Sequence, residues 1–273
     1  MKAVFSRLTL MVSICVMTML SANVSAATDE EYSDSFKKVA NPEQFMASEF
    51  KSAKAENKKL IFALGGNWCH DSRSLAKKLD DADLSKMISE NYRLSLIDVG
   101  YLSDGYEFIE KANMTTYYAT PTVLIFDPET GEQINSEDMH IWASAYTVSQ
   151  DDTYAYFEKY SKGAQGSSAV KGAVKDSGNN LSKAQQAKLQ ELEQFIKLQE
   201  QRIKASYGVT GPMLASYKAG VKEPKFDEYW EVLSKMRNSL PADIKTVREQ
   251  ILAASDSEVA AIEMPKYETF PWE

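Results

Sequence analysis

Cys69 stands in a segment of reactive and polar residue types, Trp68-Cys69-His70-Asp71-Ser72. It follows a short apolar run, Leu60–Leu64, and a pair of glycines, and it precedes an amphipathic stretch that begins near Ser72. That order predicts a strand, a tight loop and a helix, with Cys69 in the first turn of the helix. Free N–H groups and the helix dipole stabilise a thiolate there. Because a thiolate attacks disulfides, the segment predicts a thiol suited to disulfide exchange.

The other cysteine, Cys15, lies in an N-terminal segment with the pattern of a secretory signal peptide. Basic residues precede an apolar run, Leu8–Leu20, and small residues follow it up to Ala26, after which we expect cleavage. The run is short for a membrane span, which needs about 20 residues. An uncleaved anchor is the alternative interpretation. We therefore expect residues 1–26 to be a signal peptide, and the protein to be secreted, into a bacterial periplasm.

The charge of the chain excludes some classes of partner. Its 31 Lys and Arg residues against 39 Asp and Glu residues give a formal net charge of −8. An acidic protein is a poor match for nucleic acid or an anionic membrane. No apolar run after Ala26 is long enough to span a bilayer.

Cysteine usage is unusual for an exported protein. Loss of Cys15 with the signal leaves one thiol in a compartment where disulfides persist, so no internal bridge can form. Cys69 is then either a buried, inert thiol or a thiol kept for exchange with other molecules. The glycines before it and its polar neighbours favour the second interpretation.

Residues 27–161 have the pattern of an α/β domain, a mixed sheet flanked by helices. Helix starts are expected at Pro42, with Asn41 as N-cap, and after Ser149. An amphipathic helix from Ser72 is expected to include Leu84 on its apolar face. Further strands are expected at Tyr92–Val99 and Thr122–Phe126, with a hairpin partner beginning at Ile134 and a possible extension of the sheet at Ile141 and Trp142.

The remainder of the chain predicts a linker and then helices. Residues 162–180 are rich in Gly, Ser and Ala, as linkers are. Residues 181–273 predict a small C-terminal helical bundle, whose helices begin at a Ser182 capping box and at Pro224 and Pro241. Glu200 and Lys204 have the spacing of a favourable pair on one helix. The apolar stripes predict a core more readily than a binding groove.

Two motifs resemble the thioredoxin superfamily. Lys59–Leu79 is similar to its active-site strand and helix, whose motif is Trp-Cys-x-x-Cys, with Ser72 here in place of the second cysteine. Tyr118–Thr122, followed by the apolar run Val123–Phe126, resembles its cis-proline segment, and the spacing between the motifs suits that fold. The resemblance covers Pro42–Tyr160 and leaves out the C-terminal helices.

The resemblance implies roles for particular residues. Cys69 matches the nucleophile, and Pro121 matches the cis-proline, whose preceding residue presents backbone groups to an extended substrate. The catalytic candidates are Cys69, Ser72 and His70, and the substrate-binding candidates are Trp68, Thr120 and Pro121. An ordinary trans proline at the start of a strand is the alternative for Pro121.

Departures from the family pattern limit the reactions that we expect of Cys69. Ser72 cannot resolve a mixed disulfide, so release needs an outside thiol or the substrate's own second cysteine. Ala63 stands where thioredoxins place a buried acid, which weakens the interpretation as an efficient reductase. His70 either supports the thiolate with partial positive charge or is a solvated residue. Ser72 either donates a hydrogen bond to the thiolate or is a neutral helix residue.

No cofactor is expected. A metal site built from Cys69, His70, Asp71 and the distant His140 has no ligand spacing to recommend it.

The first functional hypothesis is monothiol thiol–disulfide exchange with client proteins or a small thiol. The alternative is a thioredoxin-like binding, chaperone or adaptor module that acts through its helical C-terminal region.

Overall fold

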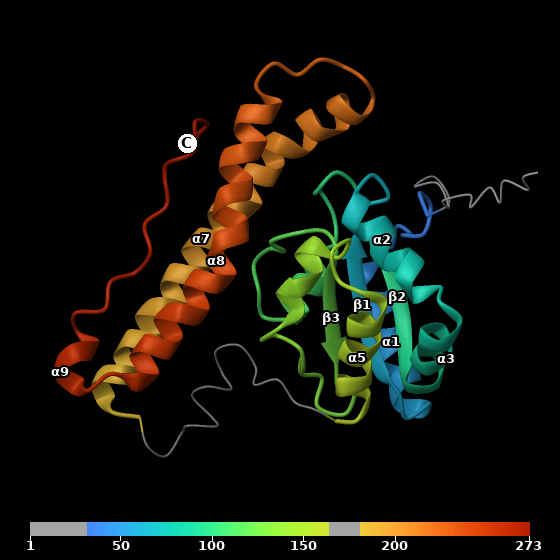
Figure 1. The fold of residues 1–273 in the computed structure, drawn as a ribbon, viewed down its shortest axis with the longest axis horizontal. Coiled ribbons are helices and arrows are strands. Elements are labelled where there is room, and N and C mark those ends of the chain that lie inside the picture. The colour runs from blue at the N-terminus through green and yellow to red at the C-terminus, as the bar shows by residue number, and fades with distance from the viewer. Residues whose placement is uncertain (1–31, 164–180) are drawn as a thin grey trace, which may run out of the picture.

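The computed structural model describes residues 32–163 and 181–273 of the chain. The expected signal peptide and residues 164–180 of the expected linker lie outside these ranges. Figure 1 shows a layered α/β part and, beside it, a pair of long helices. Within the two described ranges, no helix is both long enough and apolar enough to cross a bilayer.

Within the described residues, three strands form the sheet, in the order β2-β1-β3. The central strand β1 (Lys59–Gly65) runs parallel to β2 (Tyr92–Asp98) and antiparallel to β3 (Thr122–Phe126). All of β3, and all of β1 after its first residue, is buried. Burial on both faces explains why these strands read as continuous apolar runs. The predicted mixed sheet is confirmed.

The hairpin partner expected after β3 is reduced to a single bridge, between Phe126 and Gln133. A side chain takes the place of the next ladder bonds. The buried Asn135 amide donates to the Val123 carbonyl at 2.8 Å and accepts from the Ile125 amide at 2.9 Å. These two bonds satisfy backbone groups that a longer strand would have paired.

The possible sheet extension at Ile141 and Trp142 is wrong. Both residues belong to the short 3-10 helix η1 (Met139–Ser144). Trp142 is fully buried, with its ring 4.9 Å from that of Tyr156 and 5.5 Å from that of Phe157. A large aromatic side chain gains more from this enclosed packing than from a place on a sheet edge.

Helices cover both faces of the sheet, as Figure 1 shows. The side chains of β1 alternate between the faces. Phe62 packs toward Phe108, 4.9 Å away between ring centroids, whereas Ala63 belongs to the cluster on the other face. The helices of the Phe62 face are α1 (Pro42–Ala55) and α4 (Tyr106–Lys111), and those of the Ala63 face are α2 (His70–Leu79), α3 (Ala82–Asn91) and α5 (Gln150–Ser161).

The helix starts agree with the sequence more often than the helix ends. Asn41, Ser149 and Ser182 all cap helices as predicted. The single helix expected to reach Leu84 is wrong, because α2 stops before Asp80. The Asp81 carboxylate then accepts from two backbone amides and starts α3. A strong N-cap therefore breaks a pattern that the apolar spacing alone would continue.

The C-terminal region consists of α7 (Lys183–Lys218), α8 (Phe226–Ala253) and the short α9 (Asp256–Val259). The prediction of C-terminal helices that pack together is confirmed, because α7 packs against α8. Pro241 does not open a helix but lies inside α8. An internal proline costs about 3 kcal/mol. Burial of the stripe on both sides of it offsets this cost; its members are Leu233, Met236, Leu240, Ile244 and Val247.

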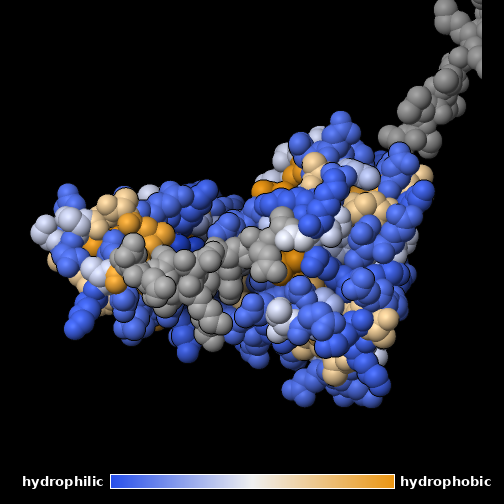
Figure 2. Space-filling view, turned by 90° about the horizontal axis from the view of Figure 1, so that it is seen from below, coloured by the Kyte–Doolittle hydropathy of each residue, from blue (hydrophilic) through white to orange (hydrophobic). Residues whose placement is uncertain are grey.

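One hydrophobic cluster joins the α/β part and the helices. It contains Leu60 and Phe62 of β1 together with Ile203 and Tyr207 of α7 and Leu233 of α8. The two parts are therefore not separated by water at this interface. Figure 2 shows a face that is mostly hydrophilic, with hydrophobic side chains gathered at the end of the helical part where α9 lies.

Candidate functional site

Cys69 lies where the sequence predicted it, between β1 and α2. It is the N-cap residue of α2 and has extended backbone angles. Its amide donates to the Gly66 carbonyl at 2.8 Å, and its carbonyl accepts from the Arg73 amide at 3.1 Å. The residue is half-buried. An enclosed, inert thiol does not fit this exposure, because part of the side chain remains open to reagents.

The structure brings Cys69 and Thr120 together across 51 residues of chain. The Cys69 thiol donates to the Thr120 carbonyl, with 3.1 Å between Sγ and the oxygen. The bond between Thr120 and Pro121 is cis, as the resemblance implied, and β3 follows directly. The Cys69 thiol thus rests against the backbone of the cis-proline segment.

A tight loop delivers the cysteine, and two aromatic residues set its shape. The Trp68 indole donates to the Gly100 carbonyl at 2.7 Å and stacks on Tyr101 with the rings 15° from parallel. A side chain at position 66 would place its Cβ 2.5 Å from the Trp68 indole nitrogen. Only glycine therefore lets Trp68 lie flat beside the site.

The segment before α1 also holds this loop. The Asn67 side chain accepts from the Phe36 amide at 3.0 Å and donates to the Phe36 carbonyl at 2.9 Å. A Cβ at Gly65 would overlap the Phe36 ring. The sequence pattern does not predict this pair. The only local signal was a polar Asn67 beside glycines, which does not reveal a partner 31 residues away.

Ser72 is completely buried and accepts a hydrogen bond from the Gly66 amide at 3.2 Å. Its hydroxyl therefore ties the first turn of α2 back to the loop that precedes Cys69. Burial and this bond account for a small hydroxyl residue at the position. A side chain three residues after Cys69 lies on the same face of the helix, which is where a second thiol would stand.

The residues just after η1 contact the first turn of α2. The exposed His70 ring lies 4.4 Å from the ring of Tyr146, which is itself 63% exposed. The Asp71 carboxylate accepts from the Tyr146 amide at 2.9 Å. Asp71 thus fixes this loop, and His70 stands in solvent beside it.

Among the described residues, His140 does not join Cys69, His70 and Asp71 in a group that could hold a metal ion. Its ring is 5.4 Å from that of Tyr118. Across the part of the chain that the structure describes, no group of three or more His, Cys, Asp or Glu side chains is placed to hold a metal ion.

Burial lowers the pKa of His140 to about 4, and the nearby Asp138 charge opposes this shift. The unfolded chain therefore takes up a proton first as the pH falls. We expect His140 to remove about 3 kcal/mol from the free energy of unfolding between pH 7 and pH 4. Urea unfolding of wild type and His140→Phe at both pH values measures this loss. Parallel pH profiles for the two proteins would contradict it.

A hollow of about 710 Å³ lies beside Trp68. Trp68 and the residues after β2, including Tyr101, line it together with residues of α7, among them Lys204, Tyr207 and Gly211. A Cβ at Gly211 would overlap the Tyr101 carbonyl oxygen, so α7 approaches this loop closely. The C-terminal helices thus line the surroundings of the site.

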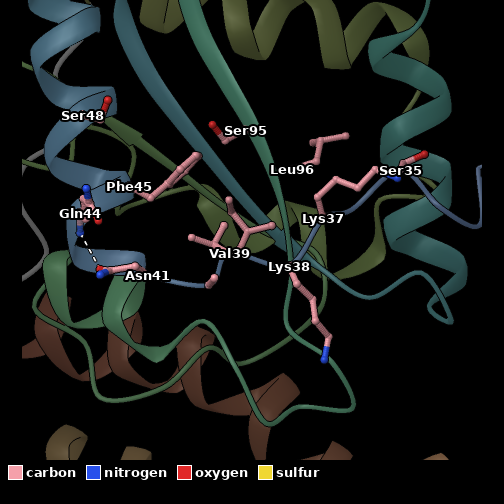
Figure 3. Close-up of a pocket in the computed structure, with 12 residues that line it drawn as sticks. Ser35, Lys37, Lys38, Val39, Asn41, Gln44, Phe45, Ser48, Ser95 and Leu96 are labelled. Atoms are coloured by element: carbon pink, nitrogen blue, oxygen red, sulfur yellow. Dashed lines mark hydrogen bonds between the residues drawn. The ribbon is translucent and has the colours of Figure 1, made fainter.

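A second hollow, of about 630 Å³, lies at the outer edge of β2 (Figure 3). Its lining comes from the segment before α1, from α1 and from β2, and includes Lys38, Val39, Phe45 and Leu96. None of the predicted site residues lines it. The predicted site residues therefore lie away from this second hollow, and Trp68 lines the first one.

The family model described as thioredoxin-like matches residues 41–128. Among solved structures, a disulphide isomerase from Xylella fastidiosa Temecula1 is 21% identical with a TM-score of 0.40, covering 46% of this chain and 95% of that one. No curated protein matches the chain. Residues 41–128 thus match a thioredoxin-like domain. The matched residues end before the C-terminal helices begin.

Proposed function

We propose that this protein is an exported, thioredoxin-like protein that performs monothiol thiol–disulfide exchange on client proteins through Cys69. The observation that carries the proposal is the contact of Cys69 Sγ with the Thr120 carbonyl, 3.1 Å away, directly before the cis bond to Pro121. A nucleophile at a helix N-terminus thereby stands against a backbone segment that can align an extended chain.

The exchange conserves electrons. The Cys69 thiolate attacks one sulfur of a client disulfide, so a new disulfide forms between Cys69 and the client while the client's own S–S bond breaks. The displaced client sulfur leaves as a thiolate and takes up a proton. A second thiol, from the client or from a small molecule, then attacks the mixed disulfide and returns Cys69 as a thiolate. No net oxidation occurs.

Trp68, Thr120 and Pro121 would bind the client during this reaction. Backbone groups beside the cis bond pair with an extended client segment as an added strand would. The half-buried Trp68 and the hollow beside it give room for apolar side chains that flank the client cysteine. His70, exposed beside the thiol, would meet the client at the other side.

Trapping in the native compartment tests the proposal. Cells that express wild type or Cys69→Ala are quenched with acid, free thiols are blocked, and adducts are compared on non-reducing gels. We expect wild type to carry mixed disulfides that disappear with reductant and are missing from Cys69→Ala. The complete lack of Cys69-dependent adducts under oxidising stress would exclude exchange as the function.

A second candidate function, binding without turnover, is favoured by large apolar side chains exposed on and after α7. Leu198, Tyr217 and Val221 are each more than half exposed. Deletion of the helices cannot test this function, because their removal would uncover the shared hydrophobic cluster. Polar substitutions at Leu198 and Val221, which do not belong to that cluster, instead leave it intact. If they abolish the cellular phenotype while Cys69→Ala does not, binding rather than exchange is the function.

A further inference from the structure

Helix α7 holds the segment that leads to the cis-proline. Glu200 accepts two hydrogen bonds from it, one from the Thr115 amide at 2.7 Å and one from the Tyr118 hydroxyl at 2.6 Å. Two turns further along α7, the Tyr207 hydroxyl donates to the Tyr117 carbonyl at 2.9 Å. Three hydrogen bonds with one helix therefore hold three residues of this segment, Thr115, Tyr117 and Tyr118.

These hydrogen bonds are buried, and in each of them the donor and the acceptor can be identified. Glu200 is 4% exposed. Burial raises its pKa, and the hydrogen bonds from Tyr118 and Thr115 oppose that rise. Burial also raises the pKa of the Tyr118 hydroxyl well above its ordinary value, and the Glu200 charge adds to the effect. The hydroxyl is therefore a stable donor to the carboxylate.

Packing alone does not explain a carboxylate here. In the described ranges, no lysine or arginine forms an ion pair with Glu200, and its partners are neutral donors. Lys204, which the sequence placed as its partner, instead lies 3.6 Å from Glu110 and over the Tyr106 ring. An apolar residue would fill this space at lower cost. The Glu200 carboxylate instead fixes the positions of two donors, the Thr115 amide and the Tyr118 hydroxyl.

That position bears directly on Cys69. Two residues after Tyr118 the chain reaches Thr120, whose carbonyl accepts from the thiol. The turn between them is tied by the Thr122 hydroxyl, which donates to the Ala119 carbonyl at 2.7 Å. A shift at Tyr118 therefore moves the Thr120 backbone against the nucleophile. Displacements of about 1 Å in such alignments cost up to about a hundredfold in rate.

We propose that Glu200 and Tyr207 are positioning residues, through which α7 sets the client-binding backbone at Thr120. The inference rests on the proposed exchange function of Cys69. It assigns the C-terminal helices a part in reactions with peptide disulfides, which pair with the Thr120 backbone. Small disulfides, which need only the thiol, depend on this part far less.

Two probe disulfides separate these cases. The first is a short peptide whose cysteine carries an aromatic thiol, and the second is the symmetrical aromatic disulfide without a peptide. In both, the Cys69 thiolate forms a new disulfide, the original S–S bond breaks, and a coloured aromatic thiolate leaves. The ratio of the peptide rate to the small-disulfide rate reports alignment, because thiol reactivity enters both rates.

We expect Glu200→Gln to lower this ratio about tenfold. The glutamine oxygen can accept from only one donor, and its amide group then faces the other. Tyr118→Phe in the Glu200→Gln background removes the surplus donor and is expected to restore most of the ratio. Glu191→Gln, the same change at an exposed position on α7, is the matched control and leaves the ratio at the wild-type value.

The outcomes are separable. A Glu200→Gln ratio within about twofold of wild type overturns the inference and leaves exchange standing, as does unchanged hydrogen exchange of the Thr115 amide. A wild type that reacts with the peptide disulfide no faster than Cys69→Ala overturns the exchange function and the inference with it. If Glu200→Gln does not fold, Tyr207→Phe, which removes only a hydroxyl, must show a fall of the ratio in the same direction.

Discussion

Replacing Cys69 with serine is expected to lower the rate of exchange with a peptide disulfide at least about a thousandfold. Serine keeps a donor of similar size for the Thr120 carbonyl, which now accepts from the thiol. The fold of the loop should therefore survive while the nucleophile is lost. Stopped-flow measurement with the activated peptide disulfide gives the rate, and thermal unfolding of both proteins checks the fold.

Ser74→Ala serves as the control for this substitution. Ser74 lies on α2, five residues after Cys69, and its hydroxyl accepts from Lys78 at 2.8 Å. Its loss perturbs the helix surface without touching the thiol. Exchange by Cys69→Ser at a substantial fraction of the wild-type rate would mean that another group performs the reaction, and the assignment of the nucleophile would be wrong.

Replacing Ser72 with cysteine is expected to shorten the life of a Cys69 mixed disulfide at least about a hundredfold. The new thiol lies one helical turn from Cys69 and attacks the mixed disulfide within the same molecule. The client leaves as a thiol, and Cys69 and Cys at position 72 become an internal disulfide. Adduct decay after thiol quenching, followed on non-reducing gels, measures the lifetime.

The cost of this change is local. Cysteine loses the hydroxyl that accepts from the Gly66 amide, so we expect a loss of stability of about 1 kcal/mol. Ser74→Cys is the matched control, because it adds a thiol to the same helix on a different face. An adduct that lives as long in Ser72→Cys as in wild type would show that the first turn of α2 does not present position 72 to the mixed disulfide.

Local patterns explain why much of the site was predictable. The apolar run of β1 and the glycines after it place Cys69, and the capping signals of Asn41 and Ser149 are short-range hydrogen bonds that sequence spacing encodes. The cis bond before Pro121 followed from resemblance to a family, not from spacing. These features depend on a few consecutive residues.

The features that escaped prediction depend on distant partners. Glu200 has the spacing of a solvent-exposed partner for Lys204, yet it is buried against Thr115 and Tyr118, more than 80 residues away in the chain. No helical pattern distinguishes these two states, because the difference lies in the surface that the helix meets. The prediction that Pro241 opens a helix was wrong for the same reason. Burial of the surrounding residues outweighed the preference of proline for a helix start.

The hydrophobic cluster that joins β1 to α7 and α8 has a consequence for how such a chain can evolve. A domain that is gained or lost by recombination must leave a surface that tolerates water. Here the loss of the C-terminal helices would expose Tyr117 and Tyr118, which lie against α7 beside the cis-proline segment. The helices are thus not a detachable appendage, and the two regions must accumulate substitutions in concert, as the halves of a single core do.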